Sequence, residues 1–166
     1  NRRRPNNTPL HAGKGTLYEG GIRVPLIISG PGLKTGYSTV AVSGTDLFAS
    51  FATWAGAAIE AGESEDLTPL LKGLEEEFRR DHALLFHYPH YGRGQLQKPQ
   101  TALVMDEWKL IKDWETGSYH LYNLASDLGE KSDLSTREKD VFREMLASMD
   151  KRLQAVGAQL PLENPD

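Results

Sequence analysis

The sequence contains no cysteine, which excludes disulfide bonds, thiolate metal sites and a cysteine nucleophile within the chain. No apolar run approaches the roughly 20 residues that span a bilayer, so we expect no membrane-spanning segment. Basic residues are not in excess either, and the net formal charge of −4 makes nucleic acid a poor candidate partner. The chain has 166 residues, of which 39% are hydrophobic and 25% are charged. This length and composition are sufficient for a buried hydrophobic core.

The first part of the chain has the pattern of a sheet covered on both faces. Residues 24–29 form a continuous apolar run that ends at a Gly-Pro-Gly turn, which predicts a strand buried on both sides. Residues 46–55 carry apolar side chains at the helical period, with Asp46 suited to the N-cap, and a shorter helix is expected over 68–73. One two-sided strand and one helix cannot cover each other, so we expect a preceding N-terminal domain or a second copy of the chain to bury this part.

The second part has the pattern of an antiparallel sheet with one long helix. Four short strands are predicted, at 83–88, 101–106, 108–112 and 119–124. The residues at 105–108 and 115–118 have the composition of hairpin turns, so these strands are expected to form a meander. Residues 137–156 place their apolar side chains on one helical stripe, long enough to cover such a sheet. We place the boundary near residue 74, which divides the chain into 1–73 and 74–166.

Lys14 is the first candidate for chemistry, because glycines flank it in Gly13-Lys14-Gly15-Thr16. Flanking glycines permit tight turns and close approach of a ligand, and the ammonium offers a point charge to an oxyanion. A phosphate-binding P-loop is excluded, because Thr8 stands where that motif needs glycine and no helix is predicted to follow. Taken alone, the segment also fits an ordinary turn with a surface lysine.

Glu19 and Arg23 belong to the Glu-Gly-Gly-Ile-Arg segment that follows. We expect the two side chains to pair locally and to fix the turn into the predicted strand. Contact with a ligand is the alternative interpretation.

Residues 13–25 and the Gly-Pro-Gly at 30–32 resemble the second signature of the sulfatase family. Three further features follow in the family's order: Asp-Leu-Phe at 46–48, Pro-Leu-Leu-Lys-Gly at 69–73, and the block at 121–134. In that last block, Leu-Tyr-Asn-Leu is followed by Asp127, Gly129, Glu130 and Asp133. The resemblance covers roughly residues 8–135.

The resemblance implies an alkaline-phosphatase-like α/β fold. The chain would comprise the end of the large catalytic α/β domain and an α+β C-terminal subdomain, with a four-stranded antiparallel sheet and a long C-terminal helix. It also implies hydrolysis of sulfate esters, in a sulfated carbohydrate or an aryl sulfate, by a formylglycine residue with a Ca²⁺ ion. Lys14 aligns with the family lysine that contacts the substrate's sulfate group, so it is the predicted catalytic and substrate-binding residue. Many bacterial sulfatases are exported, which suggests a periplasmic or secreted protein.

The formylglycine and calcium sites of that family are not expected within this chain. The nucleophile arises from a [CS]-x-P-x-R motif, and the one Ser-x-Pro, beginning at Ser29, has Leu33 where arginine is required. The paired aspartates of the metal site are missing, since no two aspartates are adjacent. We therefore predict no metal ligands here, a modified nucleophile upstream, and no activity for the chain alone.

A second group of candidates follows the strand predicted at 83–88. His87, Tyr88, His90 and Tyr91 lead into a Gly-Arg-Gly loop that carries Arg93. His90 and Arg93 are candidate substrate contacts in a sugar pocket; the alternative is a strand end whose aromatic rings pack on the long helix. His11, three residues before Lys14, is a further candidate, against a surface or packed histidine.

Two other functions stay open on the sequence. One lysine does not separate sulfate from phosphate, so a phosphodiesterase or phosphonate hydrolase of the same superfamily is an alternative. The other is a non-catalytic binding or assembly module that uses the antiparallel sheet as its interaction surface. A nucleophile motif upstream would discriminate among them.

Overall fold

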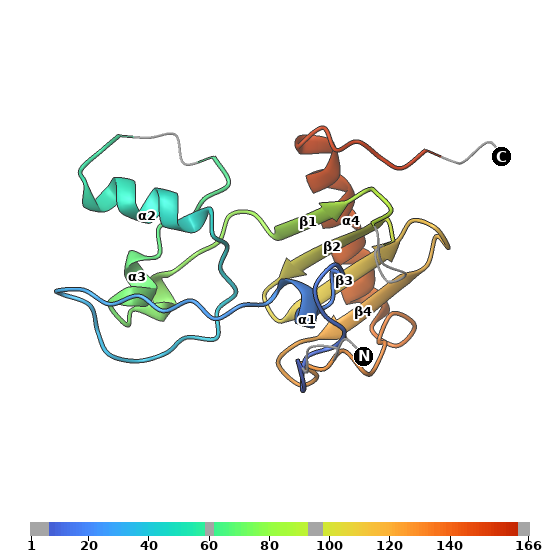
Figure 1. Cartoon of the computed structure of the whole chain (residues 1–166), viewed down its shortest axis with the longest axis horizontal. Helices are drawn as coiled ribbons and strands as arrows, with labels where there is room; N and C mark the ends of the chain where they lie inside the picture. Colours follow the sequence, from blue (N-terminus) through green and yellow to red (C-terminus); the bar gives the residue numbers. More distant parts are fainter. Residues whose placement is uncertain (1–6, 59–61, 93–97, 163–166) are drawn as a thin grey trace. The chain divides into compact units, whose positions relative to one another are not determined.

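The computed structural model describes residues 7–58, 62–92 and 98–162 (Figure 1). Their contacts group into two compact units: 7–24 with 85–162, and 25–84. The boundary expected near residue 74 does not coincide with this grouping, because residues 7–24 fold onto the C-terminal sheet. The assignment of 1–73 to the catalytic domain of a larger sulfatase stays a prediction.

The first unit is built on a four-stranded sheet in the order β1-β2-β3-β4. The strands are β1 (Leu84–Tyr88), β2 (Gln100–Met105), β3 (Trp108–Asp113) and β4 (Tyr119–Asn123). β3 pairs antiparallel with both β2 and β4, as the meander predicts. Asp106, with φ 51°, and Gly117, with φ 70°, occupy the two turns, where positive φ lets the chain reverse within a few residues.

Helix α4 (Lys139–Ala155) covers one face of this sheet and packs on β2 and β3. Leu103, Leu110 and Leu121 stand opposite one another across three strands and are fully buried. The helix buries Met145, Met149 and Leu153. The expected long helix and its apolar stripe are thus confirmed.

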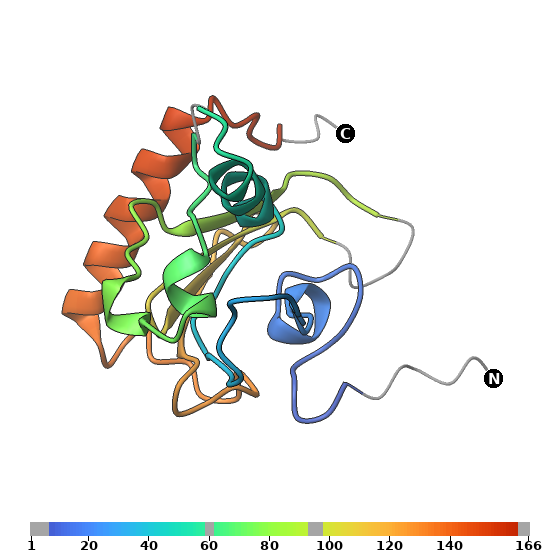
Figure 2. The same ribbon diagram turned by 90° about the vertical axis from the view of Figure 1, so that its left-hand side faces the viewer.

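The N-terminal segment covers the opposite face of the sheet. Leu17 and Tyr18 pack against the core cluster of Ala102, Ile111 and Tyr122. Helix α1 (Glu19–Ile22) follows directly. Figure 2 shows α1 and α4 on opposite sides of the sheet. The sequence does not reveal this contact, since it joins residues about 90 positions apart.

The second unit contains α2 (Asp46–Trp54), α3 (Thr68–Leu71) and the short 3₁₀ helix η1 (Glu75–Glu77). Asp46 is the first helical residue rather than the N-cap, which is Thr45. The Asp46 carboxylate is fully buried, accepts the N–H of Ser43 at 2.6 Å and of Glu65 at 2.9 Å, and pairs with Arg80 at 2.5 Å. It therefore organises the unit rather than only capping a helix. None of the helices in the described residues combines the length and apolar content needed to cross a bilayer.

The strand predicted at 24–29 is wrong for this chain. These residues form no strand, and Val24 and Ile27 are 79% and 88% exposed. A strand needs a neighbour for its N–H and C=O groups, and within the described residues no other strand lies in this unit. Phe48, Phe51 and Trp54 on α2 are exposed as well. The four of these residues that belong to this unit, Ile27, Phe48, Phe51 and Trp54, are called the exposed apolar residues below.

Candidate functional site

Lys14 lies on a loop, residues 7–18, that folds back on α1. The N–H of Gly20 donates to the carbonyl of His11 at 2.9 Å, and the Asn7 side chain donates to the carbonyl of Gly20 at 2.9 Å. Within the loop, the Thr16 hydroxyl donates to the carbonyl of Gly13 at 2.9 Å. The first two bonds attach the loop to the helix at Asn7 and His11, and the third fixes the turn around Lys14.

Gly20 and Gly21 allow this loop to approach the helix closely. A Cβ atom at Gly20 would lie 2.3 Å from the carbonyl oxygen of His11, and one at Gly21 would lie 2.0 Å from that of Thr16. Both distances are well inside van der Waals contact, so no side chain fits at either position. Gly15, next to Lys14, has φ 92°, which confirms the expected tight turn.

The Lys14 side chain is exposed and makes no ion pair within the described residues. Its ammonium is therefore accessible to an anion on a loop whose backbone is fixed. His11 on the same loop is exposed too, and its ring lies 4.1 Å from that of Tyr18, centroid to centroid. The structure thus brings Lys14 and His11 onto one loop, and their contacts with a substrate stay predictions.

A buried ion cluster lies behind this loop, between α1 and the sheet. The Lys109 ammonium on β3 lies 2.8 Å from a carboxylate oxygen of Glu19 and 2.8 Å from one of Glu130. The other Glu130 oxygen accepts the backbone N–H of Glu19 at 2.7 Å. Lys109 is completely buried, and both carboxylates are nearly so. Arg23 pairs with the second Glu19 oxygen at 3.0 Å, which confirms the expected local pair.

Burial on the α1 face of the sheet shifts the pKa values of three side chains. Burial raises the pKa of Glu130, although the Lys109 ammonium and the Glu19 N–H act in the opposite direction. Burial also raises the pKa of the Tyr18 and Tyr122 hydroxyls above its ordinary value. Lys109 is not among the residues predicted from the sequence. The available signal was a lysine directly before the buried residues Leu110 and Ile111 of a central strand.

The second group of candidates is only partly described. His90 follows β1, is exposed, and has its ring 5.9 Å from that of Tyr88 and perpendicular to it. Arg93 lies outside the described residues. Among those that are described, no hydrogen bond, ion pair or ring contact joins His90 to the Lys14 loop.

His87 has a structural role. One ring nitrogen lies 2.7 Å from the Thr101 hydroxyl and the other 2.9 Å from the carbonyl of Gln159, which follows α4. The Trp114 indole donates to the same hydroxyl at 2.8 Å. His87 therefore fits the alternative interpretation of this segment, in which aromatic rings at the end of β1 pack near the long helix.

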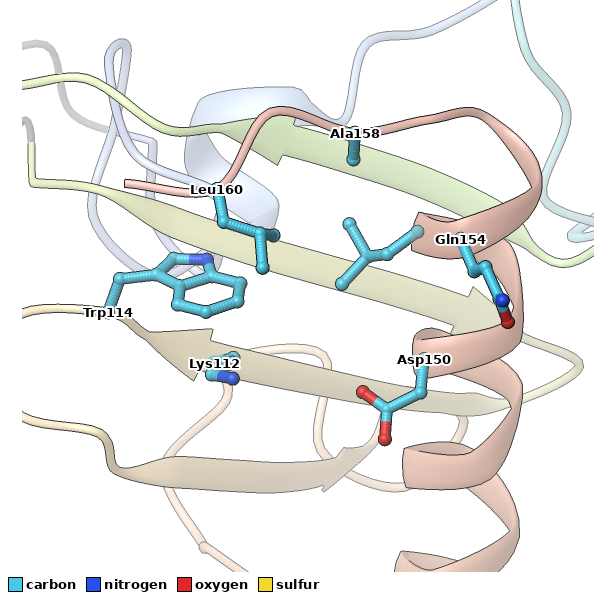
Figure 3. A pocket seen from close by; sticks show the side chains of 7 residues that line it. Lys112, Trp114, Asp150, Gln154, Ala158 and Leu160 are labelled. Carbon is cyan, nitrogen blue, oxygen red and sulfur yellow. The ribbon is translucent and has the colours of Figure 1, made fainter. Parts of the chain in front are cut away.

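A cavity of about 300 Å³ lies on the α4 face of the sheet (Figure 3). The residues that line it are Lys112, Trp114, Asp150, Leu153, Gln154, Ala158 and Leu160. The Lys112 ammonium lies 3.6 Å from the centre of the Trp114 ring, so its charge is already engaged. Lys112 points to the opposite face of β3 from Lys109, so this cavity is separate from the Lys14 loop.

The residues present do not fit a calcium site. Within 7–58, 62–92 and 98–162, no group of three or more His, Asp or Glu side chains is arranged to hold a metal ion. Ser29, the one serine two residues before a proline, lies in the exposed segment before Gly30-Pro31.

Comparisons with known proteins agree on one family. Residues 11–159 match the family model described as N-sulphoglucosamine sulphohydrolase, C-terminal. A sulfatase of Formosa agariphila is 36% identical over 142 residues, which cover 78% of this chain and 26% of that protein. Human arylsulfatase A is 39% identical over 85 residues, covering 49% of this chain and 16% of the relative. This chain thus spans about a quarter or less of the length of these relatives.

Solved structures share the fold. Ps i-CgsB, solved in complex with k-i-k-neocarrahexaose, superposes with a TM-score of 0.72 at 30% identity, over 89% of this chain and 32% of that one. BT1596, a 2-O GAG sulfatase, is 20% identical with a TM-score of 0.60, over 78% of this chain and 29% of that one. The second likeness concerns the fold alone.

Proposed function

The chain belongs to the sulfatase family and matches the C-terminal region of its members, and on this premise we propose that the whole protein hydrolyses sulfate esters. The observation that carries the proposal is Lys14: an exposed ammonium, on a loop held rigidly by Gly20 and Gly21, within the Gly-Lys-Gly-Thr segment. A sulfate group is an anion for which such a fixed charge is suited.

Lys14 would bind the sulfate group and act during cleavage of the ester. When the bond between sulfur and the ester oxygen breaks, negative charge grows on the leaving oxygen and on the sulfuryl oxygens. An ammonium fixed beside these atoms opposes that charge without rearranging. Its contribution is therefore larger in the transition state than in the bound substrate.

The substrate class we propose is a sulfated carbohydrate or an aryl sulfate. The carbohydrate in the Ps i-CgsB complex supports the first of these. His11, on the Lys14 loop, and His90 and Arg93, after β1, are the proposed contacts to the rest of the substrate. In sulfatases a formylglycine hydrate supplies the nucleophile and a Ca²⁺ ion neutralises charge; we propose that residues upstream of this chain provide both.

The exposed apolar residues of the second unit support a proposal about partners. Exposing Ile27, Phe48, Phe51 and Trp54 to water forfeits roughly 1.5–3 kcal/mol for each large side chain. We propose that an N-terminal domain of the same protein, or a second copy of this chain, covers them.

The test is a substrate comparison with the whole protein. Purified enzyme is assayed with an aryl sulfate, a sulfated oligosaccharide and the matching aryl phosphate, and residues 1–166 alone are assayed beside it with and without calcium. Turnover of the sulfates by the whole protein, and none by residues 1–166, is the expected result. Preference for the phosphate would favour the phosphodiesterase alternative, and turnover by residues 1–166 would contradict the proposed location of the nucleophile.

A further inference from the structure

The two most specific sequence blocks of this chain meet at the buried ion cluster. Glu19 belongs to the block at 13–25 and Glu130 to the block at 121–134, and Lys109 on β3 lies between their carboxylates. The cluster touches no substrate, because Lys109 is completely buried. The cluster lies behind the Lys14 loop, so it can affect the position of that loop.

Lys109 supplies the positive charge that lies between the two carboxylates of the cluster. Two carboxylates buried side by side repel each other, and one ammonium 2.8 Å from each offsets that repulsion. Without Lys109, one carboxylate must take up a proton or move toward water. Glu19 has a route to solvent, because its other partner, Arg23, is exposed. Loss of Lys109 is therefore expected to displace Glu19 and the start of α1.

A displacement of α1 should move the Lys14 loop, because helix and loop are in direct contact. Gly20 and Gly21 follow Glu19 directly, and each lies against a loop carbonyl, of His11 and of Thr16 respectively. These contacts are closely packed, since a carbon atom added at Gly20 would clash with the His11 carbonyl, and one added at Gly21 would clash with the Thr16 carbonyl. The loop between those carbonyls carries Lys14.

We propose that Lys109 is a positioning residue, which holds the Lys14 ammonium in place through Glu19 and α1. Glu130 has the supporting role: one oxygen pairs with Lys109 and the other accepts the N–H of Glu19. The proposal rests on the proposed function where it concerns catalysis, but the displacement of the loop is a separate, measurable claim.

The first experiment measures the loop directly, by amide hydrogen exchange on the full chain. The variant is Lys109→Met, which leaves the Glu19 and Glu130 carboxylates without the ammonium that lies between them. The Gly20 amide, bonded to the loop carbonyl of His11, should exchange on the order of tenfold faster, while the Leu110 amide in the middle of β3 changes little. Lys112→Met, on the same strand but the opposite face, is the matched control and should alter neither amide.

Two outcomes overturn the positioning role. Unchanged exchange at Gly20 would show that the cluster does not hold the loop. Equal acceleration at Gly20 and Leu110 would show a general loss of stability, in which Lys109 is an ordinary core residue.

The second experiment is a double-mutant cycle in the whole enzyme. The Lys109→Met variant should lower kcat on the order of tenfold when Lys14 is present, and should have little further effect in a Lys14→Ala background. The same fold loss in both backgrounds would contradict the proposal. If Lys14→Ala itself leaves kcat unchanged, the proposed function of Lys14 fails, while the exchange result still decides whether Lys109 positions the loop.

Discussion

Glu19 and Lys109 are 90 residues apart in the sequence, yet a Glu19 carboxylate oxygen and the Lys109 ammonium lie 2.8 Å apart in a site closed to water. This pair joins the segment that carries Lys14 to the central strand of the C-terminal sheet. The sheet is therefore part of the structure that presents the candidate catalytic lysine.

Removing the Glu19 carboxylate should destabilise the protein. In Glu19→Ala the Lys109 ammonium keeps only Glu130, and Arg23 loses its partner. We expect a loss of about 2–4 kcal/mol in the free energy of unfolding, measured by chemical denaturation. Glu144→Ala, at an exposed site on α4, is the control and should change it by less than about 0.5 kcal/mol. A Glu19→Ala protein as stable as the control would contradict the structural role of the cluster.

Substitution of Gly21 should displace the Lys14 loop. The added methyl group of Gly21→Ala would lie 2.0 Å from the Thr16 carbonyl oxygen, so helix or loop must move. Overpacking of this kind costs about 1–3 kcal/mol, and we expect kcat of the whole enzyme to fall as well. Gly36→Ala is the matched control, because nothing lies near its Cβ position. Wild-type melting and turnover in Gly21→Ala would show that the close approach is not needed.

Helices α2, α3 and α4 and the meander could be predicted because their signals are local, whereas 19–22 was expected to be a turn and forms helix α1. The turns at Asp106 and Gly117 each join two strands that are neighbours in the sequence, and the apolar stripe of 137–156 lies on one helix. The apolar run 24–29 failed as a strand prediction because, among the described residues, no neighbouring strand pairs with its N–H and C=O groups. The Lys14 loop was found from its glycines, whereas the Glu19–Lys109 pair was not, since no local spacing connects its two members.

Acid should weaken the protein through Asp133. Burial opposes ionisation of this carboxyl, but hydrogen bonds from the Ser135 and Leu121 amides and from His120 outweigh it and lower its pKa. A lowered folded-state pKa means that the stability it contributes is complete above its ordinary pKa and is lost as the pH falls through the lower value. In Asp133→Asn the free energy of unfolding should therefore fall less steeply with decreasing pH, in the acid range, than it does in the wild-type protein. The exposed control Asp140→Asn should keep the wild-type dependence of unfolding free energy on pH. The same wild-type dependence in Asp133→Asn would contradict the stabilising role given to the Asp133 carboxylate.

Residues 24–29 should lack protection from hydrogen exchange when the chain is a dilute monomer. Val24 and Ile27 are exposed, and within the described residues no strand pairs with this segment. Exchange is measured on residues 1–166 beside the sedimentation mass, with β3 as the protected reference. Strong protection of 24–29 in a proven monomer would show that the segment needs no covering partner.

The most direct test of the sulfatase account is the turnover of the whole enzyme with Lys14→Ala. Because the ammonium acts mainly on charge that develops in the transition state, kcat on an aryl sulfate should fall by about 10²–10³ while KM changes less. Lys151→Ala, an exposed lysine on α4, should leave both constants unchanged. A Lys14→Ala enzyme with wild-type kcat would contradict the assignment of Lys14 as the residue that carries this chain's part in sulfate ester hydrolysis.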